Sequence, residues 1–306
     1  MTDNDRDAPS PLKVRRLAGR IGAEVMDVKL SGTLTPVEVG GVRQTLLAHR
    51  VIFFRDQTQF DDAAQEAFSR LLGELVPHPT ERVRAGTLGM LELDAASGNA
   101  RADQWHTDVT FLDAPPRYSI LRAVRIPPYG GDTSWANTVA AYQSLSPELK
   151  RLAESLWAVH TNKYDYAAQY VHSSEAERRH YEEIFSKQIY ETEQPVVRLH
   201  PETGEKSLVL GQFVQRFVGQ TQADSELLFA LFQSHITRLE NTVRWNWRAN
   251  DVAIWDNQAT QHYALYDYDG QDRTMRRTTV AGEIVQGVDG RQAAIIRRPE
   301  VKDAAE

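Results

Sequence analysis

The segment Trp105-His106-Thr107-Asp108 and the later segment Trp255-Asp256-Asn257-Gln258-Ala259-Thr260-Gln261-His262 carry the pattern that decides how this sequence is interpreted. Alternate residues of an extended strand point to the same face, so His106 and Asp108 are predicted to reach one metal ion together. His262, from a distant strand, would add a second imidazole. Two imidazoles and one carboxylate leave three adjacent coordination positions open, an arrangement typical of non-haem Fe(II) oxygenases. The sequence therefore predicts an iron site in which these three residues are both metal ligands and catalytic residues.

Arginine and threonine residues near these segments predict a second binding element. Arg273 and Arg277 follow the last histidine closely, and a buried guanidinium matches a carboxylate with two parallel hydrogen bonds. Thr133, at the end of Gly130-Gly131-Asp132-Thr133, could donate its hydroxyl to the same carboxylate. Taken singly, the arginines are compatible with surface ion pairs and the threonine with a turn before a strand. Together with the metal ligands, they favour a clamp for a dicarboxylate co-substrate.

Three further residues are predicted to lie around the metal site without binding the metal. Trp255 and Asn257 flank the last predicted ligand and could orient it and exclude water, although Trp255 is equally compatible with a core position. His78 lies between two prolines at the start of the segment 76–104, where a cationic or hydrogen-bond-donating side chain could meet an anionic substrate. We interpret this glycine-containing segment as a mobile loop over the site, with one strand near Thr87–Leu93.

Composition and charge exclude several classes of protein. The chain has 306 residues, of which 41% are hydrophobic and 25% charged, as expected for a globular protein. Its net charge of −7 argues against a nucleic-acid partner, because nucleic-acid binding requires a basic face. The chain contains no cysteine, which excludes disulfides, iron–sulfur clusters, zinc–thiolate sites and cysteine nucleophiles.

Features of the termini and of the apolar runs predict localisation and domain organisation. Residues 1–11 lack the apolar core of a signal peptide. The longest strongly apolar run, Leu227–Phe232, is far shorter than the ~20 residues of a membrane-spanning helix. We therefore expect no membrane association and a cytoplasmic location. We also expect residues 1–11 to be a disordered N-terminal segment, residues 12–288 a single domain and residues 289–306 a C-terminal tail.

Short β-rich runs separated by helices predict the fold class. The predicted strands are 21–28, 51–54, 118–124, 195–199, 207–210, 242–247, 252–255 and 277–281. Signals for the start of a helix occur at Thr35-Pro36-Val37-Glu38, Asp61-Asp62, Ser146, Ser174 and Thr221. No glycine-rich phosphate loop follows a strand, and the strands do not alternate regularly with helices. The sequence therefore predicts a mainly β fold with peripheral helices, either a sandwich or a jelly roll.

Five motifs resemble those of the taurine dioxygenase family of Fe(II)/2-oxoglutarate-dependent dioxygenases. They occur in the family's order and spacing over roughly residues 12–284: W-H-T-D-V-T-F (105–111), G-G-D-T (130–133), H-P-x-T-G (200–204), W-D-N-x-x-T-Q-H (255–262) and R-x-x-x-R (273–277). Within this family the chain most closely resembles the alkylsulfatase branch, through residues 157–166, 217–219 and 240–247.

The resemblance implies a fold and a set of residue roles. The fold would be a double-stranded β-helix (jelly roll) with helices outside, and the cofactors would be Fe(II), 2-oxoglutarate as co-substrate and O2. By this resemblance, the metal would be bound by His106, Asp108 and His262, and the distal carboxylate of 2-oxoglutarate by Thr133 and Arg273. Arg277 would contact the keto-acid end of 2-oxoglutarate and the substrate's sulfur oxyanion. The substrate pocket would be lined by His78, the backbone around Val109 and the ring of Phe213.

The resemblance also implies a reaction. We expect oxidative cleavage of an alkyl sulfate ester to an aldehyde and inorganic sulfate, with succinate and carbon dioxide as co-products. Related halogenases lack the carboxylate that Asp108 supplies, so its presence favours hydroxylation. Taurine enzymes carry a tyrosine and an asparagine where this chain has Glu81 and Ala102, which argues against taurine as the substrate.

Three alternatives remain open from the sequence. They are a sulfonate dioxygenase that releases sulfite, an aryloxyalkanoate dioxygenase, and a non-catalytic jelly-roll module that binds an anion. By analogy with the family, the partners are expected to be a small organosulfur anion and further copies of the chain in a homodimer or homotetramer.

Overall fold

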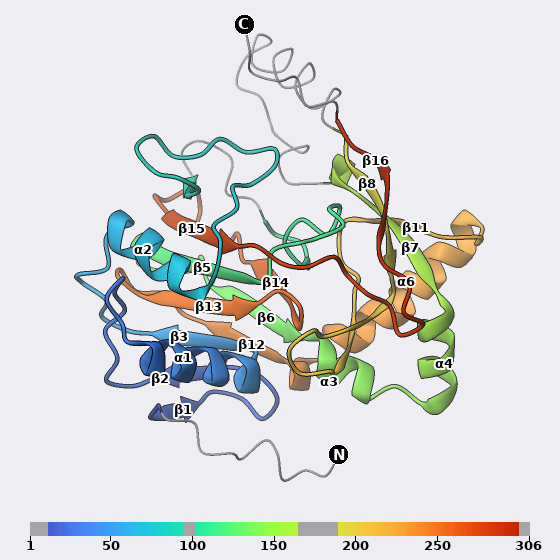
Figure 1. The fold of residues 1–306 in the computed structure, drawn as a ribbon, viewed down its shortest axis with the longest axis horizontal. Coiled ribbons are helices and arrows are strands. Elements are labelled where there is room, and N and C mark those ends of the chain that lie inside the picture. The colour runs from blue at the N-terminus through green and yellow to red at the C-terminus, as the bar shows by residue number, and fades with distance from the viewer. Residues whose placement is uncertain (1–11, 95–101, 165–188, 300–306) are drawn as a thin grey trace, which may run out of the picture.

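The computed structural model describes residues 12–94, 102–164 and 189–299. Within these ranges the chain forms mainly strands, with helices at the periphery (Figure 1). The strands are β1 (Val14–Arg16), β2 (Ala23–Val25), β3 (Val51–Phe54), β4 (Leu91–Asp94), β5 (Tyr118–Arg125), β6 (Thr133–Asn137), β7 (Trp157–Thr161), β8 (Glu191–Pro195), β9 (Val197–Leu199), β10 (Lys206–Leu208), β11 (Val214–Phe217), β12 (Thr242–Trp245), β13 (Val252–Asp256), β14 (Thr260–Ala264), β15 (Thr274–Val280) and β16 (Ala294–Arg297). The helices are α1 (Pro36–His49), α2 (Asp62–Leu72), α3 (Thr138–Gln143), α4 (Pro147–Ser155) and α6 (Gln222–Ile236), with short 3₁₀ turns η3 (Asn162–Tyr164) and η5 (Leu239–Asn241).

Two sheets packed on each other form the body of the molecule. One has seven strands in the order β1-β2-β3-β13-β5-β15-β4, and the other has the order β12-β6-β14. Aromatic side chains fill the space between them. The ring of Phe53 from β3 stacks on Trp245 of β12 with centroids 4.2 Å apart, and meets Trp135 of β6 edge-on at 5.2 Å. The predicted mainly β fold with peripheral helices, a double-stranded β-helix, is confirmed.

Strand β3 shows how the sequence specifies these layers. Successive side chains of a strand point to opposite faces. Phe53 therefore faces the aromatic layer, whereas Ile52 and Phe54 pack on the other face with Leu46 of α1 and Phe68 of α2. Because both faces are covered, all four residues of β3 are buried, which explains its uninterrupted apolar run. Figure 1 shows α1 and α2 beside this sheet.

A four-stranded sheet in the order β11-β7-β8-β16 forms a further layer next to α4 and α6 (Figure 1). Its contact with α6 buries Ala158 and Phe217 against Phe232 and Ile236. Strand β16 lies within the segment expected to be a tail, where it pairs antiparallel with β8. Residues 294–297 are therefore not a loose end. All four are exposed, so no alternating pattern in the sequence indicated a strand.

The helix-start signals correspond to real caps. The Thr35 side chain accepts a hydrogen bond from the Glu38 backbone, while the Glu38 carboxylate accepts one from the Thr35 N–H at 2.8 Å. This capping box begins α1 as predicted. The other confirmed caps, of α2, α4 and α6, are Asp61, Ser146 and Thr221. The helix predicted to begin at Ser174 lies outside the described residues. Of the helices in the described ranges, none is long and apolar enough to cross a bilayer.

Residues 76–94, the described part of the predicted mobile loop, are anchored by charged side chains. Arg84 pairs with Asp62 of α2 and with Glu92 of β4, at N–O distances of 3.2 and 2.7 Å. Glu66 of α2 accepts hydrogen bonds from two backbone N–H groups of the same segment. Strand β4, close to the strand predicted near residues 87–93, pairs with β15. The described part of the segment is therefore tied to α2 and β15, and its mobility stays a prediction.

Candidate metal centre and co-substrate site

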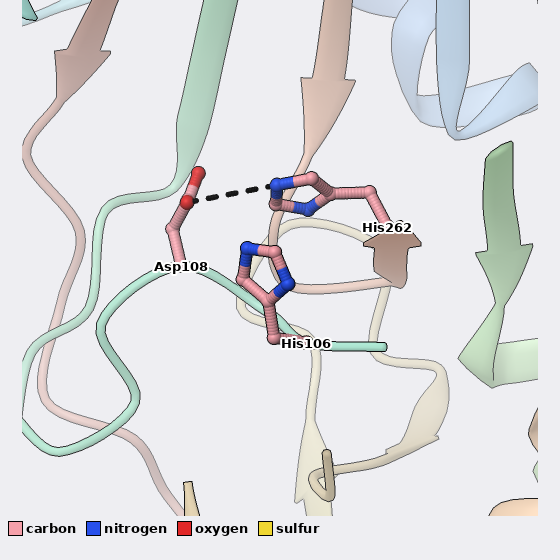
Figure 2. Close-up of side chains that lie close together, drawn as sticks. All are labelled: His106, Asp108 and His262. Carbon is pink, nitrogen blue, oxygen red and sulfur yellow. Dashed lines mark ion pairs between the residues drawn. The ribbon is translucent and has the colours of Figure 1, made fainter. Parts of the chain in front are cut away.

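A backbone bridge brings the two predicted histidine ligands together. The His106 N–H donates to the carbonyl oxygen of His262 at 3.0 Å, and the His262 N–H donates to that of His106 at 2.7 Å. The two imidazole rings consequently lie with centroids 4.0 Å apart. Figure 2 shows that both rings and the Asp108 carboxylate converge. One possible ligand atom from each side chain lies within 4.8 Å of the others, as a shared metal ion requires.

The backbone between His106 and Asp108 differs from the predicted extended strand. His106 forms only an isolated bridge, and Asp108 begins a turn. The next residue, Val109, has φ of 45°, a left-handed conformation that is rarely adopted by a β-branched side chain. The turn is closed by a hydrogen bond from the Leu112 N–H to the Val109 carbonyl oxygen at 3.0 Å. The predicted strand is therefore reduced to a bridge at His106, and a turn begins at Asp108, the second candidate ligand.

The histidines are in the chemical state that a metal ligand needs. His106 Nδ1 lies 2.7 Å from the Gln104 carbonyl oxygen, so Nδ1 carries the hydrogen and Nε2 keeps its lone pair. That Nε2 is buried and has no hydrogen-bond partner among the described residues. Burial lowers the pKa of His106 and lowers that of His262 well below its usual value. Neutral imidazoles with an unused buried nitrogen fit a metal ion.

Asp108 is held as a carboxylate by several neighbours. Its Oδ1 accepts from Arg277 Nη1 at 2.5 Å and lies 3.8 Å from His262 Nε2, while its Oδ2 accepts from the Ser119 hydroxyl at 2.7 Å. Burial alone would raise the pKa of Asp108, but the charge of Arg277 and the hydrogen bond from Ser119 bring it well below its usual value. The site thus offers an ionised carboxylate beside two neutral imidazoles. This donor set suits a divalent cation.

Arg273 and Thr133 form a second element that fits a carboxylate ligand. Arg273 is only 3% exposed, and its Nε donates to the Gly131 carbonyl oxygen at 3.0 Å. No carboxylate among the described residues forms an ion pair with its guanidinium, an unusual state for a buried charge. Thr133 Oγ1 accepts a hydrogen bond from Trp247 Nε1 at 3.0 Å, so the hydroxyl hydrogen can donate elsewhere. Both residues are therefore suited to bind an anion.

Gly131 makes the approach of Arg273 possible. Its φ is 68°, and a Cβ at this position would lie 3.0 Å from the Arg273 side chain. A larger residue would push the guanidinium away from its place. The glycine pair that precedes Thr133 in the sequence thus has a steric role in the site.

A cavity of about 200 Å³ opens beside the candidate metal ligands. Its polar members are few, with Asp108, His78 and Arg277 at one side. The rest of its wall is mostly apolar or small: Val76, Pro77, Pro79, Val109, Leu112, Ala114, Pro116, Thr279, Ala281 and Gly282. The cavity is therefore suited to a ligand with one anionic end and a hydrocarbon body.

The predicted pocket residues do not all line this cavity. His78 and Val109 do. Phe213 lies behind the metal ligands, where its ring meets His106 edge-on at 6.1 Å and Phe111 at 5.1 Å. It is 2% exposed. In this structure Phe213 thus supports a ligand and is not part of the cavity wall.

His78 acts as a neutral donor and not as a cation. Burial, together with the charge of Arg277, lowers the pKa of His78 to about 3. Its Nδ1 accepts from the Thr80 N–H at 3.4 Å, which places the ring hydrogen on Nε2. This shift favours the hydrogen-bond-donating alternative over the cationic one. A neutral imidazole can still donate a hydrogen bond to an oxyanion.

Sequence reasoning missed Ser119 and the wall formed by residues 112–116. Ser119 lies within a continuous buried strand, and a serine there matches no ligand motif. Trp255 and Asn257, named from the sequence as neighbours of the metal, do belong to the site. The Trp255 ring lies 4.8 Å from the His262 ring, and its Nε1 donates to Asn257 Oδ1 at 2.8 Å. Trp255 is also 1% exposed, so it occupies a core position, and its role in orienting His262 stays a prediction.

Two histidines and a carboxylate that converge in a jelly roll, together with a buried arginine that has no acidic partner in the described part of the chain, are the features of a metal-dependent 2-oxoglutarate dioxygenase. The chain belongs to the family described as "Taurine catabolism dioxygenase TauD, TfdA family", whose model matches residues 13–279.

Two relatives resemble the chain along nearly its whole length. One, "Alpha-ketoglutarate-dependent sulfate ester dioxygenase" of Pseudomonas putida, is 54% identical over 287 residues, which cover 94% of this chain and 95% of the relative. The other, "Alkylsulfatase" of Acinetobacter baylyi, is 50% identical over 292 residues, or 95% of this chain and 91% of the relative.

Solved structures share the fold. A putative alpha-ketoglutarate-dependent taurine dioxygenase from Burkholderia xenovorans superposes with a TM-score of 0.78 at 37% identity, covering 94% of this chain and 98% of that one. AAD-2 in complex with Mn(II) and N-oxalylglycine superposes with a TM-score of 0.72 at 27% identity, covering 89% of this chain and 97% of that one.

Proposed function

We propose that this protein is an Fe(II)- and 2-oxoglutarate-dependent dioxygenase that cleaves alkyl sulfate esters to an aldehyde and inorganic sulfate. The observation that carries the proposal is the mostly apolar cavity with Asp108, Arg277 and His78 at one side. A sulfate head fits the polar side of this cavity and an alkyl chain fits the rest. The names of the relatives from Pseudomonas putida and Acinetobacter baylyi support the same substrate class.

The residues of the chain have separate tasks in this reaction. When bound, ferrous iron together with 2-oxoglutarate and O2 supplies the oxidising power for hydroxylation of a C–H bond. His106, Asp108 and His262 would hold the metal, and Arg273 with Thr133 would fix the distal carboxylate of 2-oxoglutarate. The cavity wall would exclude water and direct one carbon of the substrate toward the metal.

Recognition of the sulfate would fall to Arg277 and His78. Both line the cavity on the side of Asp108, and a guanidinium favours an oxyanion by charge as well as by hydrogen bonding. His78, neutral with its hydrogen on Nε2, would donate to a sulfate oxygen. With the sulfate held there, the carbon that bears the ester oxygen would lie nearest to the metal.

The overall reaction balances without a further co-reactant. One oxygen atom of O2 enters succinate as 2-oxoglutarate loses carbon dioxide, and the other becomes a hydroxyl group on the substrate carbon. The hydroxylated carbon then carries both a hydroxyl and a sulfate ester. Loss of the hydroxyl proton forms the aldehyde C=O bond as the C–O bond to sulfate breaks, and inorganic sulfate leaves.

Release of sulfur oxyanions separates this proposal from its rivals. Purified protein with Fe(II) and 2-oxoglutarate is incubated with alkyl sulfates of several lengths, taurine and an aryloxyacetate, and succinate, sulfate and sulfite are measured. We expect sulfate and succinate in equal amounts from alkyl sulfates. Sulfite from taurine as the main product would establish a sulfonate dioxygenase, and turnover of aryloxyacetate alone an aryloxyalkanoate dioxygenase. Absence of succinate with every compound would favour a binding module.

The variant Asp108→Ala tests the catalytic role of the site in the same assay. We expect it to remain folded and to lose succinate and sulfate formation, because the remaining two imidazoles hold iron poorly. Circular dichroism serves as the control for folding. Turnover retained by the folded variant would contradict the assignment of Asp108 as a ligand.

Three finer features complete the proposal. Iron in the ferrous state suits the two-histidine, one-carboxylate set, and the reducing cytoplasm, where we place the protein, would maintain it. We propose a homodimer or homotetramer, to be measured by light scattering after size-exclusion chromatography. We propose no nucleic-acid partner, in keeping with the net charge of −7.

A further inference from the structure

A buried relay of three hydrogen bonds ends on the carboxylate of Asp108. Trp255 Nε1 donates to Asn257 Oδ1 at 2.8 Å, Asn257 Nδ2 donates to Ser119 Oγ at 2.8 Å, and Ser119 Oγ donates to Asp108 Oδ2 at 2.7 Å. All four residues are at most 3% exposed. Trp255 and Ser119 are directly opposite on the paired strands β13 and β5. The relay is therefore built into the central part of the large sheet.

The chemistry of the groups fixes the direction of the relay. An indole N–H can only donate, so Asn257 must turn its oxygen toward Trp255 and its NH2 group toward Ser119. The Ser119 oxygen is then used as an acceptor. Its single hydrogen points to Asp108, which as a carboxylate can only accept. Each member thus specifies the orientation of the next, from the core to the metal ligand.

The end of the relay distinguishes the two oxygens of Asp108. Oδ2 is occupied by Ser119, whereas Oδ1 lies 3.8 Å from His262 Nε2. Arg277 also binds Oδ1, but a carboxylate oxygen has lone pairs for both a hydrogen bond and a metal ion. With Oδ2 held away, Asp108 would coordinate through Oδ1 alone.

We propose that Ser119 is a positioning residue that makes Asp108 a one-oxygen ligand. The inference rests on the proposed metal site, though not on the identity of the substrate. A carboxylate that bound through both oxygens would fill an additional coordination position, and the chelating 2-oxoglutarate and O2 need the three that remain. Ser119 would thereby preserve open positions without touching the metal or the substrate.

Binding of Co(II) to Ser119→Ala tests the proposal without any turnover. Co(II) affinity is measured by calorimetry, and the visible absorption spectrum of the bound ion reports its coordination. We expect affinity to fall about 10- to 100-fold, as for other changes to groups that orient a ligand, and the spectrum to change. The matched control is Ser225→Ala, which removes another buried serine hydroxyl that accepts from the Phe217 N–H. The control should bind Co(II) like the wild type.

Asn257→Ala and the double variant test whether Asn257 acts through Ser119. Because both belong to one relay, their effects on Co(II) affinity should be strongly non-additive, with the double variant close to Ser119→Ala. If Ser119→Ala fails to fold, Asn257→Ala alone should still weaken binding and alter the spectrum. Wild-type affinity and spectrum in the folded variants, or additive effects, would overturn the proposal. Failure of sulfate release with these Co(II) results intact would affect only the proposed function.

Discussion

Arg273 and Arg277 are both buried arginines near the start of β15, yet their charges are balanced in different ways. Arg277 forms a short ion pair with Asp108, whereas Arg273 has no acidic partner among the described residues and bonds only to a carbonyl oxygen there. A buried charge without a partner destabilises a fold, while removal of one member of a buried pair leaves the other uncompensated. The two arginines should therefore respond differently to the same substitution.

Methionine at each position separates binding from stability. Arg273→Met should leave the free energy of unfolding within about 1 kcal/mol of the wild type, because no partner is stranded. It should weaken 2-oxoglutarate binding about 100-fold through loss of a buried carboxylate pair. Arg277→Met should instead destabilise the metal-free protein by about 3 kcal/mol, since Asp108 remains buried and charged. Urea unfolding and 2-oxoglutarate titration check both variants. Equal destabilisation would contradict the assignment of Arg273 to a ligand.

Glu81 adds a titratable group near Arg277. Burial raises the pKa of Glu81 to about 7, although the charge of Arg277 opposes the shift. In the unfolded chain the carboxyl has its ordinary pKa of 4.5, so between about pH 4.5 and pH 7 the folded protein binds a proton that the unfolded chain has lost. The contribution of Glu81 to stability is therefore full at low pH and is lost as pH rises toward 7. Above that pH its negative charge also offsets Arg277.

Substrate binding should follow this ionisation. We expect the KM for an alkyl sulfate to rise about three-fold between about pH 6 and about pH 8, because the ionised Glu81 weakens the attraction of Arg277 for the sulfate. Glu81→Gln should remove the rise, as it mimics the neutral form. KM measured across this range with Glu74→Gln, a change at an exposed position, provides the control. A rise that persists in Glu81→Gln would have another origin.

At the scale of secondary structure, the segment 112–116 forms one wall of the cavity, with Leu112, Ala114 and Pro116. It directly follows the turn at Asp108, so a short stretch of chain joins the candidate metal ligand to this wall. A larger side chain at Ala114 would shorten the space available to a hydrocarbon tail. The position should therefore control the length of substrate that is accepted.

Ala114→Phe should shift the preference toward short alkyl sulfates. We expect kcat/KM for the longest accepted chain to fall at least about 10-fold, since each methylene in a hydrophobic pocket contributes about 1 kcal/mol or more. The value for the shortest substrate should change little. Ala230→Phe, at an exposed position on α6, is the matched control. An equal loss for all chain lengths would indicate a disturbed metal site and not a length limit.

Prediction from the sequence succeeded where residues close together in the chain determine the bounds of a helix or strand. Strand β3 has the predicted bounds because its apolar run is covered on both faces, and α1 begins at its capping box. A strand was expected at His262, but the bounds and pairing of β14 were not predicted, because its partners β6 and the segment at His106 are distant in the chain. The three candidate ligands, predicted from motifs of specific spacing, do converge in the structure. The turn at Val109 was missed, since nothing local indicates a left-handed valine.

At the scale of the whole molecule, the site lies where the two packed sheets meet. His262 belongs to β14 of the small sheet, whereas Arg277 belongs to β15 of the large sheet. Asp108 contacts both, through Arg277 and through the proximity of its Oδ1 to His262. A metal ion held by Asp108 and the histidines would therefore link segments that belong to different layers of the fold. Ligand binding should stabilise the molecule as a unit.

Thermal unfolding measures how much a bound metal ion and 2-oxoglutarate stabilise the fold. Mn(II), which does not oxidise during heating as ferrous iron does, is added with 2-oxoglutarate at about 100 times their dissociation constants. Each ligand that binds only the folded state contributes about 2.7 kcal/mol at that excess, so the two together contribute about 5.4 kcal/mol. For a chain of this size this corresponds to a rise in Tm of about 8 °C. In Asp108→Ala the rise should disappear, because the remaining histidines hold the metal poorly. In Arg273→Met the rise from Mn(II) should persist, while the increment from 2-oxoglutarate is lost. An equal rise in all three proteins would mean that Mn(II) binds elsewhere on the chain.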